Sequence, residues 1–261
     1  MLAKVMLAEE AIGRGNDEEN SFSIESINEW ISRSIPVNNF CETTGFNDDI
    51  KEMLVEQLKK TSNSYRKNFI ETLKEIQVVN VDKRSFYRHD QKSLNIDLKK
   101  RVKACSFYEN PLHVFFHEMG HAIDYNRCDT TRFTFSDVFK EAFRKDISLL
   151  IQKLSDENEV IKMQKIRNDH ESRGIQDIFS SLPYLNKKGE FKGKLNNENV
   201  NKLKPNYVHE ESYWTRRNDP AIDARSELFA HISAAQASKK QQEYMRQYFP
   251  NSFKAFSELL H

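Results

Sequence analysis

Cysteine is scarce in this chain of 261 residues, which contains only Cys41, Cys105 and Cys128. No two of them form a Cys-x-x-Cys pair, and their number is odd. This usage fits a reducing compartment at least during synthesis. We therefore expect a protein that is cytoplasmic when it is made, while later delivery or export without a classical signal peptide stays open.

The sequence also lacks a long apolar run. No stretch approaches the roughly 18 apolar residues of a membrane-spanning helix, so no membrane span is expected. Residues 1–15 contain one lysine and a short apolar stretch that acidic residues interrupt, unlike the hydrophobic region of a signal peptide. They are predicted to form a short amphipathic helix that ends at Gly13 or Gly15.

An excess of one charge sign is missing as well. The chain has 40 basic and 39 acidic residues and a formal net charge of +1. Nothing in this balance indicates a surface for nucleic acid, and the short basic run at 99–101 is interpreted as a solvated face. The hydrophobic fraction of 38%, with 18 Phe and 9 Tyr, is enough for a core.

One motif names a chemistry, and it is His117-Glu118-Met119-Gly120-His121. Two histidines four residues apart lie on one face of an α-helix, so both imidazoles can reach the same metal ion. The glutamate after the first histidine can take a proton from water held by that metal. The motif is the core of a zinc hydrolase and predicts Zn²⁺ as the cofactor.

The residues around the motif predict a buried helix. Pro111 can open this helix at its first turn. Apolar residues lie on several of its sides: Leu112, Val114, Phe115, Phe116, Met119, Ala122 and Ile123. Buried histidines and a buried carboxylate need partners, and a metal would supply them. The alternative is a chance match, in which two ordinary core histidines are satisfied by hydrogen bonds. Gly120 allows another backbone or a substrate to approach closely.

A catalytic zinc site needs a third protein ligand if one position is to stay open for water. The extended metalloprotease pattern HExxHxxGxxH is excluded, because Asp124 and Arg127 occupy its Gly and His positions. The remaining strong candidate is a glutamate on a second helix downstream.

Residues 221–237 are predicted to form that second helix, with an apolar side and with Pro220 at its start. Asp223, Glu227 and His231 are spaced four apart and share one of its faces. We choose Glu227 as the third metal ligand and His231 as a residue that supports the ligands from behind. A solvated polar stripe, or His231 as the ligand instead, is the alternative.

These segments resemble the glutamate zincins, most of all the branch that holds anthrax lethal factor, the clostridial Pro-Pro endopeptidases and the small peptidase domains that accompany phage head-morphogenesis proteins. The residues that carry the resemblance are 116–124 (FHEMGHAID) and 226–231 (SELFAH). Weaker likeness lies in 174–179, 209–214 and 248–256, so the resemblance covers roughly residues 75–260.

The resemblance implies a zincin-like metallopeptidase domain, and a tyrosine or histidine that stabilises the oxyanion formed during peptide hydrolysis. Tyr213 is the nearest match to the family's tyrosine, and His209 is the second candidate. Asp124 lies one helical turn past His121, where it either orients a ligand histidine or is a solvated residue at the helix end.

The predicted fold class is α+β, mostly helical with a small mixed sheet before the motif helix. Residues 1–47 are expected to form a helical N-terminal segment and linker, and residues 48–261 the metallopeptidase domain. A long amphipathic stretch is predicted over 48–76. Short strands are expected after it, over 77–82, 85–88, 94–98 and 104–108.

Three further expectations concern the surroundings of the cleft. The edge strand at 94–97 is a candidate to pair with an extended peptide substrate, or is an ordinary sheet edge. Residues 133–156 form an amphipathic helix that 157–173 extend. Residues 182–208, rich in Lys, Asn and Gly, are interpreted as a loop or hairpin near the cleft.

The expected function is zinc-dependent endopeptidase activity on a peptide or protein substrate. Glu118 would deprotonate the attacking water and then protonate the leaving amine. Two alternatives stay open. One is a phage- or toxin-associated structural or interaction protein whose zinc site serves folding, and the other is an effector whose peptidase acts on one host protein after delivery.

Overall fold

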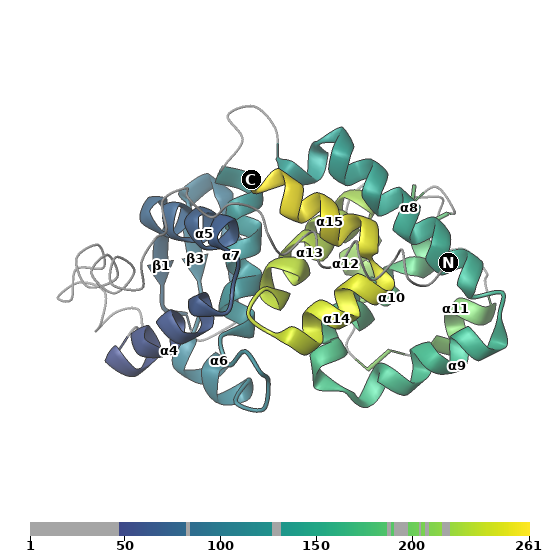
Figure 1. Cartoon of the computed structure of the whole chain (residues 1–261), viewed down its shortest axis with the longest axis horizontal. Coiled ribbons are helices and arrows are strands. Elements are labelled where there is room, and N and C mark those ends of the chain that lie inside the picture. The colour runs from purple at the N-terminus through teal and green to yellow at the C-terminus, as the bar shows by residue number, and fades with distance from the viewer. Residues whose placement is uncertain are drawn as a thin grey trace, which may run out of the picture.

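The computed structural model describes residues 47–81, 84–126, 132–186, 189–190, 198–203, 205–206, 209–215 and 220–261. Within these residues the fold is mostly helical with one small mixed sheet, so the α+β class is confirmed (Figure 1). The helices and linker predicted for residues 1–46 lie outside the described residues. None of the described helices is both long enough and apolar enough to span a membrane.

The stretch predicted over 48–76 is two helices rather than one. Helix α4 (Asp48–Lys59) ends before Ser62, whose hydroxyl accepts a hydrogen bond from the Tyr65 N–H and caps α5 (Asn63–Glu75). The Arg66 guanidinium donates back to the Leu58 carbonyl at 3.0 Å, which satisfies an acceptor at the end of α4. The break between the two helices depends on side-chain caps. The spacing of apolar residues, from which one long helix was predicted, contains no information about such caps.

The sheet has the order β1-β3-β2, in which β1 (Gln77–Val79) is parallel and β2 (Phe86–Arg88) antiparallel to β3 (Ser93–Asn95). The prediction of an edge strand at 94–97 is therefore wrong, because β3 lies in the middle and is buried. Strand β2 is the edge that faces the motif helix α7 (His113–Asn126).

The strand predicted at 104–108 is also wrong. Residues 98–104 form helix α6 (Leu98–Ala104), because the Asp97 carboxylate accepts a hydrogen bond from the Lys100 N–H at 3.0 Å and caps a new helix. A turn follows this helix and leads to α7.

Two helices replace the one expected over 133–173. A 3₁₀ turn (Phe133–Phe135) precedes α8 (Asp137–Lys153). The predicted extension is a separate helix, α9 (Glu157–Lys165), because the Asp156 side chain accepts from the Asn158 N–H at 2.8 Å and caps it. The remaining helices are α10 (Arg173–Ser181), α11 (Glu198–Leu203), α12 (Glu211–Thr215), α13 (Pro220–Ala235), α14 (Lys239–Tyr248) and α15 (Pro250–Leu259).

The segment 182–208, expected to be a loop or hairpin, contains a 3₁₀ turn at Leu182–Tyr184 and the short helix α11. Its residues 187–188, 191–197, 204 and 207–208 lie outside the described part of the chain.

Helix α7 packs along α13 in the middle of the molecule, with α5 and the sheet on its other side (Figure 1). Gly120 makes this close packing possible, because a Cβ placed there would lie 2.7 Å from the Ala230 Cα. Beside it, the Ser233 hydroxyl donates to the Phe116 carbonyl at 2.9 Å and is 2.7 Å from the Tyr65 hydroxyl. The close approach aligns the motif histidines with the side chains of α13.

Candidate metal centre

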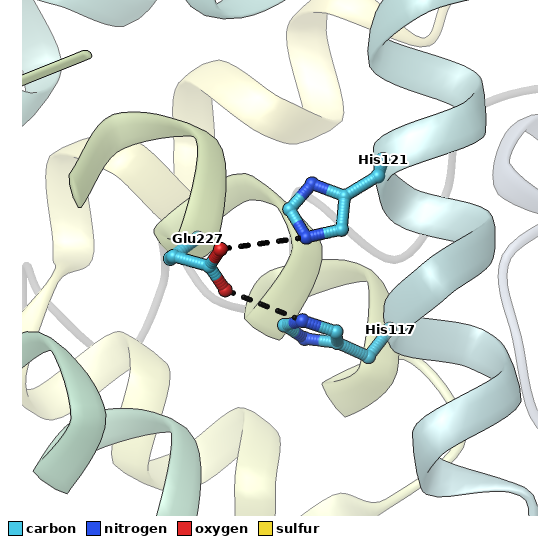
Figure 2. A group of neighbouring side chains, drawn as sticks. All are labelled: His117, His121 and Glu227. Atoms are coloured by element: carbon cyan, nitrogen blue, oxygen red, sulfur yellow. Dashed lines mark ion pairs between the residues drawn. The ribbon is translucent and has the colours of Figure 1, made fainter. Parts of the chain in front are cut away.

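His117 and His121 project from successive turns of α7 toward Glu227 on α13 (Figure 2). The His117 Nε2 atom lies 3.3 Å from Glu227 Oε2, and the His121 Nε2 atom lies 3.6 Å from Glu227 Oε1. One donor atom from each of the three side chains falls within 4.8 Å of the others. The structure thus brings together the three ligands that we predicted from the sequence.

The spacing of these atoms fits a metal ion better than direct pairing. A tetrahedral zinc with bonds of about 2.0–2.1 Å holds its ligand atoms about 3.4 Å apart. Glu227 is only 3% exposed. Its buried Oε2 atom accepts no hydrogen bond from a described residue. A buried carboxylate oxygen in this situation is costly unless it binds something. Two imidazoles and a carboxylate are also a donor set that catalytic zinc takes.

The charges of the three groups depend on one another. Burial opposes ionisation of Glu227, but the neighbouring His121 and His117 hold its pKa well below the usual range. Burial also disfavours a charged His121, yet Glu227, Glu118 and Asp124 outweigh it and raise the pKa of His121 to about 9. For His117, burial and the nearby His231 lower the pKa to about 3. The carboxylates around His121 thus favour its charged form, whereas burial disfavours that of His117.

This distribution predicts how zinc binding depends on pH. In metal-free protein the His121 ring should stay protonated until about pH 9, and the His117 ring should stay neutral down to about pH 3. Because a ligand histidine must be neutral, zinc has to displace the His121 proton, and zinc affinity should fall as the pH drops below 9. A ¹⁵N NMR titration of the histidine rings in the presence of a chelator measures both values; a His121 that titrates below pH 7 would contradict the expectation.

Glu118 follows His117 on α7, and its side chain contacts strand β2 rather than Glu227. The backbone of Tyr87 in the edge strand β2 forms a hydrogen bond with its carboxyl group. Burial is the main cause that raises the pKa of Glu118 to about 7, a value suited to a group that accepts and returns a proton near neutral pH. Its residual exposure of 7% is toward a cavity.

That cavity has a volume of about 680 Å³, and His117 is the candidate ligand that lies on its wall. His117, Glu118, His209, Tyr213 and His231 are on its wall. A substrate in this space would contact a ligand histidine and the carboxyl group of Glu118 at the same time. The cavity therefore reaches the site at His117 and Glu118.

Tyr213 and His209, the two candidates for the oxyanion donor, both lie on the wall of this cavity. The Tyr213 hydroxyl donates a hydrogen bond to Glu227 Oε1, although fourteen positions separate the two residues in the sequence. The His209 ring stacks on the Tyr213 ring with 3.8 Å between their centroids. The two side chains therefore form one unit on the cavity wall.

Asp177 on α10 is a central residue that our sequence reasoning missed. Its carboxylate accepts hydrogen bonds from the His209 ring at 2.7 Å and from the His209 N–H at 3.2 Å, and it lies 2.9 Å from His231 Nε2. Burial opposes its ionisation, but the two histidines keep its pKa below the usual range. The segment 174–179 carried part of the family resemblance, but no local pattern in it marks Asp177 as a partner of distant histidines.

His231 lies directly behind a candidate ligand. Its ring centroid is 4.5 Å from that of His117, and its Nε2 atom forms a hydrogen bond with Asp177. Gly174 leaves room for this ring, because a Cβ there would lie 2.9 Å from it. Asp177, Glu227 and His231 also satisfy the spacing of a metal-binding group, so His231 remains a possible ligand by geometry.

Asp124 is fully buried, so it is not a solvated residue at the helix end. Its carboxylate accepts hydrogen bonds from the Thr134 N–H and hydroxyl, both at 2.8 Å, and so fixes the segment after α7. The Nδ1 atom of His121 instead lies 3.3 Å from the Ser226 hydroxyl, a contact that the sequence did not indicate. Asp223, on the same face of α13 as Glu227, is buried as well.

In comparisons with protein-family models, curated proteins and solved structures, the chain gives no significant match. The likeness to glutamate zincins therefore stays a prediction that rests on the motif residues.

Proposed function

We propose that the chain is a zinc-dependent endopeptidase. The observation that carries this proposal is the metal-ligand spacing of His117, His121 and Glu227 beside a buried Glu118 on the wall of an accessible cavity. Zinc sites that only support folding are usually closed by four protein ligands, whereas catalytic sites use three and leave one position open. The three-residue group next to a cavity favours the catalytic class over a site that serves folding alone.

A zinc ion held by these three residues would polarise a carbonyl group and make a water molecule more acidic. Glu118 accepts a proton from the attacking water, whose oxygen forms a bond to the carbonyl carbon. The same carboxyl group then delivers that proton to the amide nitrogen as the C–N bond breaks, so that a carboxylic acid and an amine are released. The edge strand β2 holds Glu118 in place through the backbone of Tyr87.

Tyr213 and His209 are the two groups that we propose as donors to the developing oxyanion. The Tyr213 hydroxyl is already within the ligand cluster, and Asp177 orients the His209 ring from behind. The Tyr213 hydroxyl would leave Glu227 Oε1 for the oxyanion when a substrate is bound. Association with a phage particle or delivery into a host stays a prediction from the family resemblance.

Replacing Tyr213 with phenylalanine should lower kcat by on the order of 10²-fold and change KM little, because the donated hydrogen bond matters most in the transition state. Zinc content should stay the same, since the hydroxyl contributes no ligand atom. His209→Ala tests the competing assignment: a larger loss of kcat in that variant, with Tyr213→Phe still active, would transfer the role to His209.

The experiment that tests the proposed function is a digest of an unbiased peptide library with zinc-loaded protein, read by mass spectrometry. We expect new peptide termini that disappear when a chelator removes the zinc and return when zinc is added back. Bound zinc without any new termini would support the alternative in which the metal serves folding.

A further inference from the structure

A second hollow is formed by α9, the turn that follows it, and α11, which packs beside α9 (Figure 1). Its volume is about 570 Å³. We call it the α9–α11 groove. The described residues on its wall are Ile161, Gln164, Lys165, Arg167, Asn168 and Lys202.

The wall of the α9–α11 groove carries three positive charges and, among its described residues, no carboxylate. The side chains of Lys165, Arg167 and Lys202 are all exposed. None of the three forms an ion pair with a described residue. The three cations therefore face solvent in one hollow without a counter-charge on its wall.

The carboxylates of the neighbouring segments do not cancel this charge. Glu159 and Asp169 each already form an ion pair with a lysine outside the groove wall, at 2.6 Å and 2.7 Å. Glu157 and Glu198 begin α9 and α11, whereas the lysines of the groove are in the last turns of these helices. A hollow with a surplus of one charge concentrates groups of the opposite charge.

Hydrogen bonds fix the backbone that carries the three cations and join the groove to the cavity of the metal centre. The Gln164 side-chain amide donates to the Lys202 carbonyl at 2.7 Å and so ties α9 to α11. The Asn206 amide donates to the Arg167 carbonyl at 2.9 Å and to Asn168 Oδ1 at 3.1 Å. Asn206 itself is on the wall of the cavity that His117 and Glu118 line, so the two hollows are adjacent.

The groove has the chemistry of a site for an acidic stretch of polypeptide. Lysine and arginine side chains form charge-assisted hydrogen bonds with carboxylates. On the same wall Ile161 is 43% exposed and can pack against an apolar side chain, for which the sugar–phosphate backbone of a nucleic acid has no counterpart. The exposed amide of Asn168 can bond to a peptide group.

We propose that the α9–α11 groove binds an acidic segment of the protein substrate, an inference that rests on the proposed peptidase function. One extended chain can occupy both hollows, with the scissile bond beside Glu118 and the acidic segment on Lys165, Arg167 and Lys202. Contacts at two places on one chain raise the affinity for that substrate. The groove takes no part in breaking the bond.

Fluorescence anisotropy with zinc-loaded Glu118→Gln protein tests the groove. A labelled peptide in which glutamates flank an isoleucine should bind. Adding Lys165→Glu and Lys202→Glu should raise its Kd by about 10-fold, because two attractions become two repulsions. The matched control, Lys67→Glu with Lys99→Glu, makes the same change of charge at exposed lysines of α5 and α6 and should alter Kd by less than about twofold.

Three further results distinguish the groove from the peptidase. Binding of the glutamate peptide that the groove variant weakens, together with a library digest that yields no new termini, would support the groove and refute the peptidase. An unchanged Kd in the groove variant, or equal binding of a peptide with lysines in place of the glutamates, would overturn the groove even if peptides are hydrolysed. Tighter binding of a labelled single-stranded oligonucleotide, lost in the groove variant, would assign the groove to nucleic acid and overturn the proposal as well.

Discussion

Replacing Glu118 with glutamine is expected to lower kcat for peptide hydrolysis by about 10²- to 10⁴-fold, the usual contribution of a general base. Glutamine has nearly the same shape as glutamate, but it cannot take a proton from the attacking water. Zinc content and thermal stability should stay close to those of the unchanged protein, because Glu118 is not one of the three ligands. Kinetic assays on a cleaved library peptide, together with a zinc assay on the same samples, measure both quantities.

The matched control for this change is Glu243→Gln, which alters the same functional group on the exposed surface of α14. It should leave kcat unchanged. Turnover close to normal in the Glu118→Gln variant would show that another group accepts the proton, and the mechanism proposed for this site would be wrong.

Removing the third ligand should have the second large effect. The Glu227→Gln variant should lose most of the zinc, from about one ion per chain, and with it the hydrolytic activity, because an amide oxygen carries no charge to bind the metal. His121→Ala should lose zinc for the same reason. Both are measured by dialysis against a weak chelator followed by elemental analysis.

Asp223→Asn separates loss of a ligand from loss of a buried carboxylate. Asp223 lies one helical turn before Glu227 on α13 and is also buried, but it does not belong to the metal-binding group. We expect this variant to keep its zinc even if its stability falls. A Glu227→Gln protein that holds zinc as tightly as the Asp223→Asn protein would remove Glu227 from the ligand set.

The meeting of the two motif histidines with Glu227 could be predicted, because the placement of each side chain follows from the geometry of a single helix. Histidines four apart must share a face of α7, and a carboxylate in the apolar helix α13 needs a partner. The position of Asp177 could not be predicted in this way. Its pairing with His209 and His231 depends on how α10 packs against α13, and no local period records that packing.

The errors in the fold have a common physical origin in side-chain caps and strand pairing. The cap at Ser62 divides the predicted long helix. The cap at Asp97 starts α6 between two of the predicted strands, so residues 105–107 follow a helix as a turn. The order of the three strands depends on long-range pairing, so β2 rather than β3 became the edge beside Glu118. Arg101 belongs to the basic run 99–101, which we expected to be a solvated face, but it lies on the cavity wall. A short basic run carries no information about which segments pack against it.

Diffraction from crystals of the zinc-loaded protein at the zinc absorption edge tests the central claim most directly. The account predicts one strong anomalous peak about 2.0–2.2 Å from His117 Nε2, His121 Nε2 and a carboxylate oxygen of Glu227, with Glu118 beside it but not bound. A peak at any other group of residues, or a Glu227 carboxylate turned away from the two histidines, would contradict it.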